Sequence, residues 1–198
     1  MTESPFFNRI NALLSYSSKD SSDAKRICSV HTGHASLAAT ELEEIEALAS
    51  EKSAHLIRLA YAIAERRVTD SFRFGICHSD EEVIRYLQAK LYSKAKEASY
   101  LMLFDKDGKA ISCEFLGEGT VNFLAVAPRT VLEVAIKKKA ADAVIAHNHP
   151  GGIAKASCED IEATRIIAEL FEATGRRLKA HYIFAGDKYD VIIPSTTE

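Results

Sequence analysis

The chain has 198 residues, a hydrophobic fraction of 47% and a formal net charge of −3. This length allows one domain with its own core and a smaller appended unit. The weak negative charge excludes a chain-wide attraction to nucleic acid, so a nucleic-acid role would need a local basic surface. Apolar runs all fall short of the roughly 18 residues that a membrane span requires, and no membrane partner is expected.

The cysteines are scattered along the chain and form no C-x-x-C pair: Cys28, Cys77, Cys113 and Cys158. Such spacing indicates reduced thiols in a cytosolic protein rather than a disulfide framework. The first seven residues lack the basic-then-apolar pattern of a signal peptide. The expected location is the cytoplasm.

Residues 1–24 are expected to be a flexible N-terminal segment. An apolar piece, Ile10 to Leu14, precedes the polar run 15–23. A composition of this kind buries little surface, which predicts a short helix at most, followed by a linker.

Residues 25–75 are predicted to form a small helical module. Thr40 precedes an acidic helix start with Glu43 at its third position, and Ser53 opens a second helix whose apolar residues recur at helical spacing. The link between the two helices is 49–52.

Residues 76–198 have the pattern of an α/β domain, a mixed sheet flanked by helices. Ser79 and Glu82 form a capping box at the first helix of this domain. The apolar run before His147 reads as a central strand covered on both faces. The further elements are expected as strands 100–104, 110–116, 121–126, 142–146, 178–185 and 189–193, and as helices 128–139 and 157–174, with a hairpin turn at 105–108.

Two histidines at the end of the central strand indicate a metal site. His147 and His149 are separated by one residue, so their side chains point to the same side of a strand. Asp160 lies on the inward stripe of the following helix, so its carboxylate points toward the strand end. Two imidazoles and a carboxylate suit Zn²⁺, with one position open for water. The alternative is a loop with two surface histidines, in which Ser157 and Asp160 form an ordinary capping box.

A hydrolytic zinc site also needs a general base beside the activated water. Glu114 and Glu118 are the two possibilities, both on or just after the second strand and of the same strand parity. Local sequence does not choose between them, and a solvent-facing strand glutamate is the alternative for either.

The motif His147-x-His149-Pro150, followed by Ser157-x-x-Asp160, resembles the JAMM motif of JAB/MPN-domain metallopeptidases. The order and spacing of Gly119-Thr120 and 127–129 relative to that motif are similar to the bacterial RadC family. The resemblance covers about residues 76–198. It implies the JAB/MPN, cytidine-deaminase-like layering of helices on a mixed sheet.

The resemblance also implies roles for individual residues. It makes His147, His149 and Asp160 the zinc ligands. It puts the catalytic glutamate five residues before Gly119, at Glu114. Ser157 would donate a hydrogen bond to the oxyanion or to the bound water.

Residues 40–67 resemble, more weakly, half of the helix-hairpin-helix at the N-terminus of RadC proteins. Such hairpins carry glycines whose amides meet DNA phosphate, whereas the link 49–52 has no glycine and contains an acid. The basic clusters 137–139 and 176–179 are expected to be solvated helix ends. His31 and His34 form a His-x-x-His pair without nearby acids or cysteines, so a metal there is not expected. His181 is expected to be a satisfied core or surface histidine.

The sequence therefore predicts a zinc-dependent hydrolase of peptide or isopeptide bonds, with a protein or peptide as its substrate. The alternative is a DNA repair or recombination accessory that binds nucleic acid through the helical module. The oligomeric state and the particular bond stay open at this point.

Overall fold

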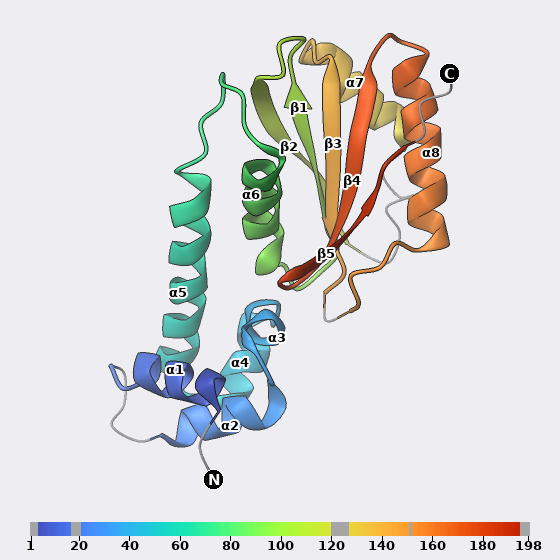
Figure 1. Ribbon diagram of the computed structural model, residues 1–198. Helices are drawn as coiled ribbons and strands as arrows, with labels where there is room; N and C mark the ends of the chain where they lie inside the picture. The colour runs from blue at the N-terminus through green and yellow to red at the C-terminus, as the bar shows by residue number, and fades with distance from the viewer. Residues whose placement is uncertain (1–3, 17–20, 120–126, 151, 195–198) are drawn as a thin grey trace.

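A computed structural model describes residues 4–16, 21–119, 127–150 and 152–194, which form a helical module and an α/β domain (Figure 1). The domain is built on a five-stranded sheet in the order β2-β1-β3-β4-β5. Its strands are β1 (Ala98–Phe104), β2 (Ala110–Glu118), β3 (Asp142–Asn148), β4 (Arg177–Ala185) and β5 (Lys188–Ile192).

The sheet is mixed, as predicted. β3 and β4 run parallel, whereas the β1–β2, β1–β3 and β4–β5 pairs are antiparallel. β3 occupies the middle of the five strands, which confirms the prediction of a central strand ending in the two histidines. The strand expected at 121–126 lies outside the described residues.

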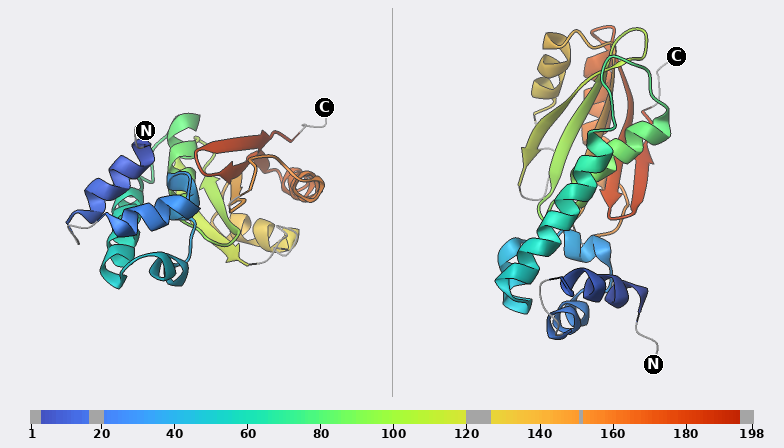
Figure 2. Two further views of the ribbon diagram at one scale, coloured as in Figure 1. Left: turned by 90° about the horizontal axis from the view of Figure 1, so that it is seen from below. Right: turned by 90° about the vertical axis from the view of Figure 1, so that its left-hand side faces the viewer.

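Helices cover both faces of the sheet (Figure 2). α6 (Asp80–Tyr92) packs on one face against apolar side chains of β1, β3 and β4. α7 (Pro128–Lys137) and α8 (Cys158–Glu172) cover the other face. Burial on two faces explains why β3 is apolar at consecutive positions, since neither side of the strand meets water.

Local signals set several element boundaries of this domain as predicted. The hydroxyl of Ser79 accepts from the Glu82 amide while the Glu82 carboxylate accepts from the Ser79 amide, and this capping box starts α6. Gly108 takes a positive φ of 78° in the β1–β2 hairpin, a conformation that glycine adopts without strain.

The helical module has its own apolar core. Its helices are α1 (Pro5–Leu14), α2 (Ser22–Val30), α3 (His34–Ala38), α4 (Leu42–Leu48) and α5 (Glu51–Thr69). α1 is the short helix expected within residues 1–24, and it packs with the module, because Phe7, Ile10 and Leu14 are buried in that core. Their spacing of three and four residues puts them on one face of the helix.

Two helix starts in the module differ from the prediction. Thr40 does not cap α4, because its hydroxyl donates to the Ser36 carbonyl instead. Ser50, rather than Ser53, is the cap of α5, and its hydroxyl accepts from the Ser53 amide. Both serines fit a cap sequence, and the structure selects the earlier one.

The module packs against the α/β domain at the β4–β5 turn. A Cβ added at Gly186 would fall far inside van der Waals contact with the Ala35 side chain of α3. Gln88 of α6 donates to the Gly186 carbonyl over 2.9 Å.

None of the helices in the described ranges is long and apolar enough to cross a bilayer.

Candidate metal centre

The carboxyl end of β3 places two imidazoles side by side. His147 belongs to β3, and the amide of His149 donates to the Phe184 carbonyl over 2.7 Å, which extends the pairing with β4. The Nε2 atoms of the two rings lie 3.0 Å apart. His147 is fully buried, whereas His149 is partly exposed, so the pair is reached from one side only.

Asp160, in the first turn of α8, brings a carboxylate to these rings. Its Oδ1 lies 3.3 Å from His147 Nε2 and its Oδ2 lies 3.6 Å from His149 Nε2. Ligand atoms about 2.0–2.1 Å from a tetrahedral zinc ion lie about 3.3 Å from one another. The spacing of the three donors is compatible with a tetrahedral metal ion of this kind.

Burial and charge determine the protonation of this group. Burial lowers the pKa of His147 to about 4, so its imidazole is neutral at pH 7. For Asp160, burial raises the pKa, but the proximity of His149 and His147 and the hydrogen bonds from Ser157 outweigh burial and hold the pKa below its usual range. A neutral imidazole beside an ionised carboxylate is the state in which both groups bind a metal.

Ser157 holds the Asp160 carboxylate in place. It is the N-cap of α8, and its hydroxyl accepts from the Asp160 amide. The same hydroxyl and the Ser157 amide both donate to Asp160 Oδ2, over 2.7 and 2.8 Å. The capping box and the histidine–aspartate cluster thus exist together, and the two interpretations of Ser157-x-x-Asp160 are not exclusive.

Glu97 is a carboxylate, beside the two histidines, that sequence reasoning missed. It lies immediately before β1, and its Oε1 is 3.7 Å from His147 Nε2. Glu97, His147 and His149 also form a group that could hold a metal ion, with one ligand atom from each lying within 4.8 Å of the others. Burial raises the pKa of Glu97, and the nearby Asp160 carboxylate adds to the effect.

A signal for Glu97 exists in the register of the strands. Ser99 pairs with His147 across the antiparallel β1–β3 ladder. Continued by two residues beyond the ends of β1 and β3, the same register would set Glu97 across from His149 and on the same face. The strand was expected to begin at Tyr100, which hid this relationship.

The structure places Glu114 and Glu118 elsewhere. Glu114 pairs with Lys138 at the end of α7, with Oε1 2.6 Å from Nζ, and Glu118 lies 3.3 Å from Lys94 Nζ. A register shift between Ser99 and Tyr100 also breaks the expected parity. The glutamates consequently lie on opposite faces of the sheet, because Glu114 pairs with Leu101 and Glu118 with Ala98.

Comparison with known proteins identifies the family. The family model described as RadC-like JAB domain matches residues 77–192. The chain belongs to the RadC family. Over 122 residues, 61% of this chain, it is 30% identical to a UPF0758 protein of Photobacterium profundum, 54% of whose length is matched. Over 146 residues, 74% of this chain, it is 32% identical to a UPF0758 protein of Bordetella parapertussis, 65% of whose length is matched. The chain thus spans about half to two thirds of the length of these curated relatives.

Two residues within the RadC-like domain support the histidine segment. Asn148 points away from the imidazoles, accepts from the Ala98 amide over 2.8 Å and donates to the carbonyls of Lys94 and Lys96. Asn148 thereby ties the end of β3 to the segment that carries Glu97. Gly152 turns the chain after His149, and a Cβ there would come within 3.2 Å of His149 Cβ.

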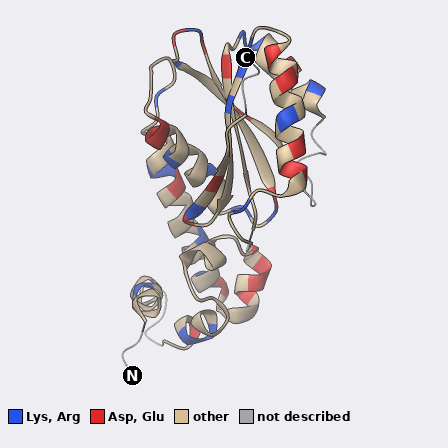
Figure 3. Ribbon diagram, turned by 45° about the vertical axis from the view of Figure 1, so that its right-hand side comes forward, with Lys and Arg blue, Asp and Glu red and all other residues tan. Residues whose placement is uncertain are grey.

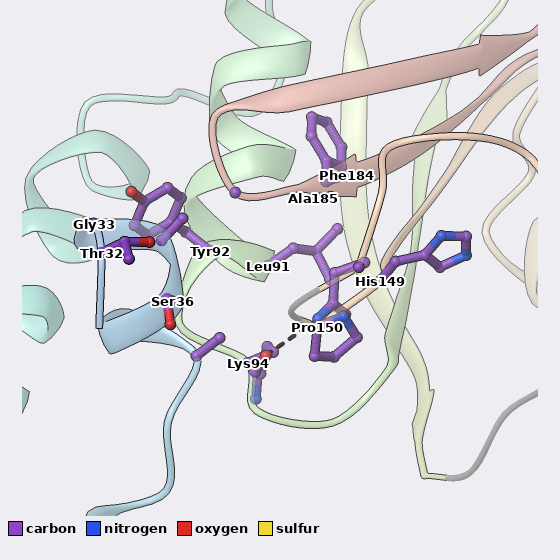
Figure 4. A pocket seen from close by; sticks show the side chains of 15 residues that line it. Thr32, Gly33, Ser36, Leu91, Tyr92, Lys94, His149, Pro150, Phe184 and Ala185 are labelled. Atoms are coloured by element: carbon purple, nitrogen blue, oxygen red, sulfur yellow. Dashed lines mark hydrogen bonds between the residues drawn. The ribbon is translucent and has the colours of Figure 1, made fainter. Parts of the chain in front are cut away.

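A cleft of about 400 Å³ opens beside the RadC-like domain's histidine loop (Figure 4). Thr32, Gly33 and Ser36 of the helical module form one wall, and Leu91, Tyr92 and Phe184 of the α/β domain face them. The His149 ring turns away from this cleft, and Pro150 lies at its edge. The helical module thus borders the approach to the histidine loop.

The remaining histidines do not belong to a further group with metal-ligand spacing among the described residues. His31 Nδ1 contacts the Ser36 hydroxyl, and His34 Nδ1 contacts the Tyr61 hydroxyl. Acidic segments are interspersed with basic ones on the helical module and on α8 (Figure 3). Among the basic clusters, Lys138 pairs with Glu114 and Arg177 pairs with Asp142.

Proposed function

We propose that this RadC protein is a zinc-dependent hydrolase of peptide or isopeptide bonds, with His147, His149 and Asp160 holding the ion. The observation that carries the proposal is the tetrahedral spacing of these three donors, with a second acidic group, Glu97, beside them. When bound, zinc supplies a Lewis acid that polarises a carbonyl and lowers the pKa of water.

Glu97 is the general base in this proposal, and it replaces Glu114 in that role. A base must reach the proton that it removes, and Glu97 lies at the histidines whereas the carboxylate of Glu114 is engaged by Lys138. Burial raises the pKa of Glu97, which makes its carboxylate a better proton acceptor. Glu97 would take a proton from the attacking water and return it to the leaving amine.

Ser157 acts first by positioning Asp160. The hydroxyl has one proton, which it donates to Asp160 Oδ2, so the hydroxyl stabilises the ionised ligand. Its predicted role as an oxyanion donor would require that proton to turn toward the substrate, and this role stays a prediction.

The nucleic-acid alternative gains no support from the helical module. The Ser50 amide, in the link compared with a phosphate-binding hairpin, donates to Asp23 Oδ2 over 3.1 Å, and the Ser50 hydroxyl donates to the same oxygen. A carboxylate of the protein thus occupies the place of an external anion. Salt-dependent DNA binding that is lost on removal of residues 1–75 would favour the alternative.

The cytoplasmic setting remains part of the proposal, and it agrees with four unpaired cysteines.

The test is a turnover screen with zinc-loaded protein against peptide and isopeptide libraries. Glu97→Gln is expected to bind zinc within a few-fold of the wild-type affinity and to lose turnover by at least about a hundredfold, because the base is removed while the donors remain. Glu114→Gln is the matched control and is expected to keep turnover. Loss of turnover in Glu114→Gln alone would return the base to Glu114, and absence of zinc from the wild-type protein would reject the proposal.

A further inference from the structure

A buried chain of polar side chains runs from His147 back to the helix that carries Asp160. His147 Nδ1 lies 2.8 Å from His181 Nε2, and His181 Nδ1 lies 2.6 Å from Thr164 Oγ1. Thr164 Oγ1 also lies 2.6 Å from the Asp160 carbonyl oxygen. The side chains of His147, His181 and Thr164 are all at most 1% exposed, so water does not substitute for these contacts.

The direction of these hydrogen bonds follows from the Asp160 carbonyl oxygen, which can accept a hydrogen bond but cannot donate one. A threonine hydroxyl has a single proton, and the Asp160 carbonyl has none to give. Both contacts of Thr164 are hydrogen bonds only if it donates to the carbonyl and accepts from His181 Nδ1–H. His181, with a proton on Nδ1, then accepts at Nε2 from His147 Nδ1–H. His147 is left with its proton on Nδ1 and its Nε2 lone pair directed toward His149 and Asp160.

We propose that Thr164 and His181 are positioning residues that fix the tautomer of His147 so that its Nε2 binds the metal. The inference rests on the metal site proposed above. The opposite direction of the chain would put a proton on His147 Nε2 and abolish ligation. Outer-shell partners of ligating histidines generally fix the ring orientation and tautomer in this way.

His149 has an equivalent partner of a simpler kind. Its Nδ1 lies 3.2 Å from the Ile153 carbonyl oxygen, which can only accept. Both ligating rings are thus oriented from behind, His149 by backbone and His147 by two side chains. Only the second arrangement can be changed by substitution, which makes it testable.

The test uses two substitutions of the same residue. Thr164→Val keeps the volume but removes the hydroxyl, whereas Thr164→Ser keeps the hydroxyl but removes the methyl group. Competition with a chromophoric chelator is expected to show zinc affinity reduced about 10–100-fold in Thr164→Val and nearly unchanged in Thr164→Ser. A purely structural role predicts no such ordering, because Thr164→Ser leaves the larger packing defect.

A second readout does not involve the metal. Long-range ¹H–¹⁵N spectra of the imidazoles in metal-free protein report which nitrogen carries the proton. We expect the Nδ1–H tautomer for His147 in the wild type and in Thr164→Ser, and a mixture in Thr164→Val. A wild-type His147 that carries its proton on Nε2 overturns the inference, as does a Thr164→Val protein with unchanged tautomer and zinc affinity.

This design separates the inference from the proposed function. If the wild type shows the Nδ1–H tautomer but binds no zinc, the metal site fails while the hydrogen-bond direction stands. Should Thr164→Val not fold, His181→Gln and His181→Leu replace it, because glutamine offers both a donor and an acceptor and leucine offers neither. His181→Gln is expected to retain more zinc affinity than His181→Leu, and equal affinities contradict the inference.

Discussion

Glu97 Oε1 lies 3.7 Å from His147 Nε2, although 50 residues of chain separate the two positions and their strands run in opposite directions. Asp160 approaches the same nitrogen to 3.3 Å from α8. Two carboxylates therefore compete for the role of third ligand. The proposed function gives this role to Asp160, whose two oxygens face both imidazoles.

The first prediction separates the two carboxylates by metal affinity. Asp160→Asn is expected to weaken zinc binding by at least about a hundredfold, because an anionic ligand is lost from a nearly closed site. Glu97→Gln is expected to change zinc affinity only a few-fold. Chelator competition measures both values. The reverse order would make Glu97 the ligand, in agreement with the grouping of Glu97, His147 and His149.

The second prediction concerns the turn after His149. Gly152→Ala is expected to weaken zinc binding several-fold, because the added Cβ at 3.2 Å from His149 Cβ presses on the ligand's own side chain. Gly33→Ala, across the same cleft, is the control, since its Cβ would meet no atom within 4 Å. Equal zinc affinities of the two variants would show that the turn has room to adjust.

The third prediction tests the contact between the module and the α/β domain. Gly186→Ala and Gly108→Ala both force alanine into a positive φ in a hairpin turn, which costs about 1–2 kcal/mol. Only position 186 also meets Ala35. Gly186→Ala is therefore expected to lower the free energy of unfolding more than Gly108→Ala does, as measured by urea denaturation. A smaller loss at position 186 would mean that the module moves away without cost.

The fourth prediction concerns acid stability of the helical module. Burial raises the pKa of Asp23, but hydrogen bonds from Ser53 and Ser50 and the charge of Arg26 outweigh burial and lower it. A lowered folded-state pKa contributes stability above the unfolded value of about 4, and the contribution disappears as the pH falls through the folded-state value. Asp23→Asn should thus destabilise the protein at neutral pH, with a difference from wild type that shrinks in acid. A difference that stays constant with pH would exclude this origin.

Strand parity and helical spacing were sufficient to predict the arrangement of His147, His149 and Asp160. His147 and His149 lie at the end of β3 and Asp160 lies in the first turn of α8, where local geometry determines the direction of each side chain. Glu97 was missed because its place depends on how β1 pairs with β3, a contact between distant segments. The register shift in β2 is likewise invisible in the local sequence. It puts Glu118 on the other face of the sheet from Glu114, since one extra residue reverses the face of every residue that follows it.

His181 shows a different limit of sequence reasoning. The prediction of a satisfied core or surface histidine agrees with its full burial and with the contacts of both ring nitrogens. The identity of its partners depends on the packing of α8 on β4, which brings Thr164 and His147 to opposite sides of one ring. A pattern along the chain does not encode which two side chains a buried ring will join.

The cleft between the two units has a consequence for work on shorter fragments. Thr32, Gly33 and Ser36 supply one of its walls, and they belong to a part of the chain that the RadC-like match at 77–192 does not include. A fragment trimmed to the matched domain would keep every proposed zinc ligand. It would lose the wall of the cleft that the helical module supplies. Under the proposed function, substrate preferences measured on such a fragment would describe the fragment alone.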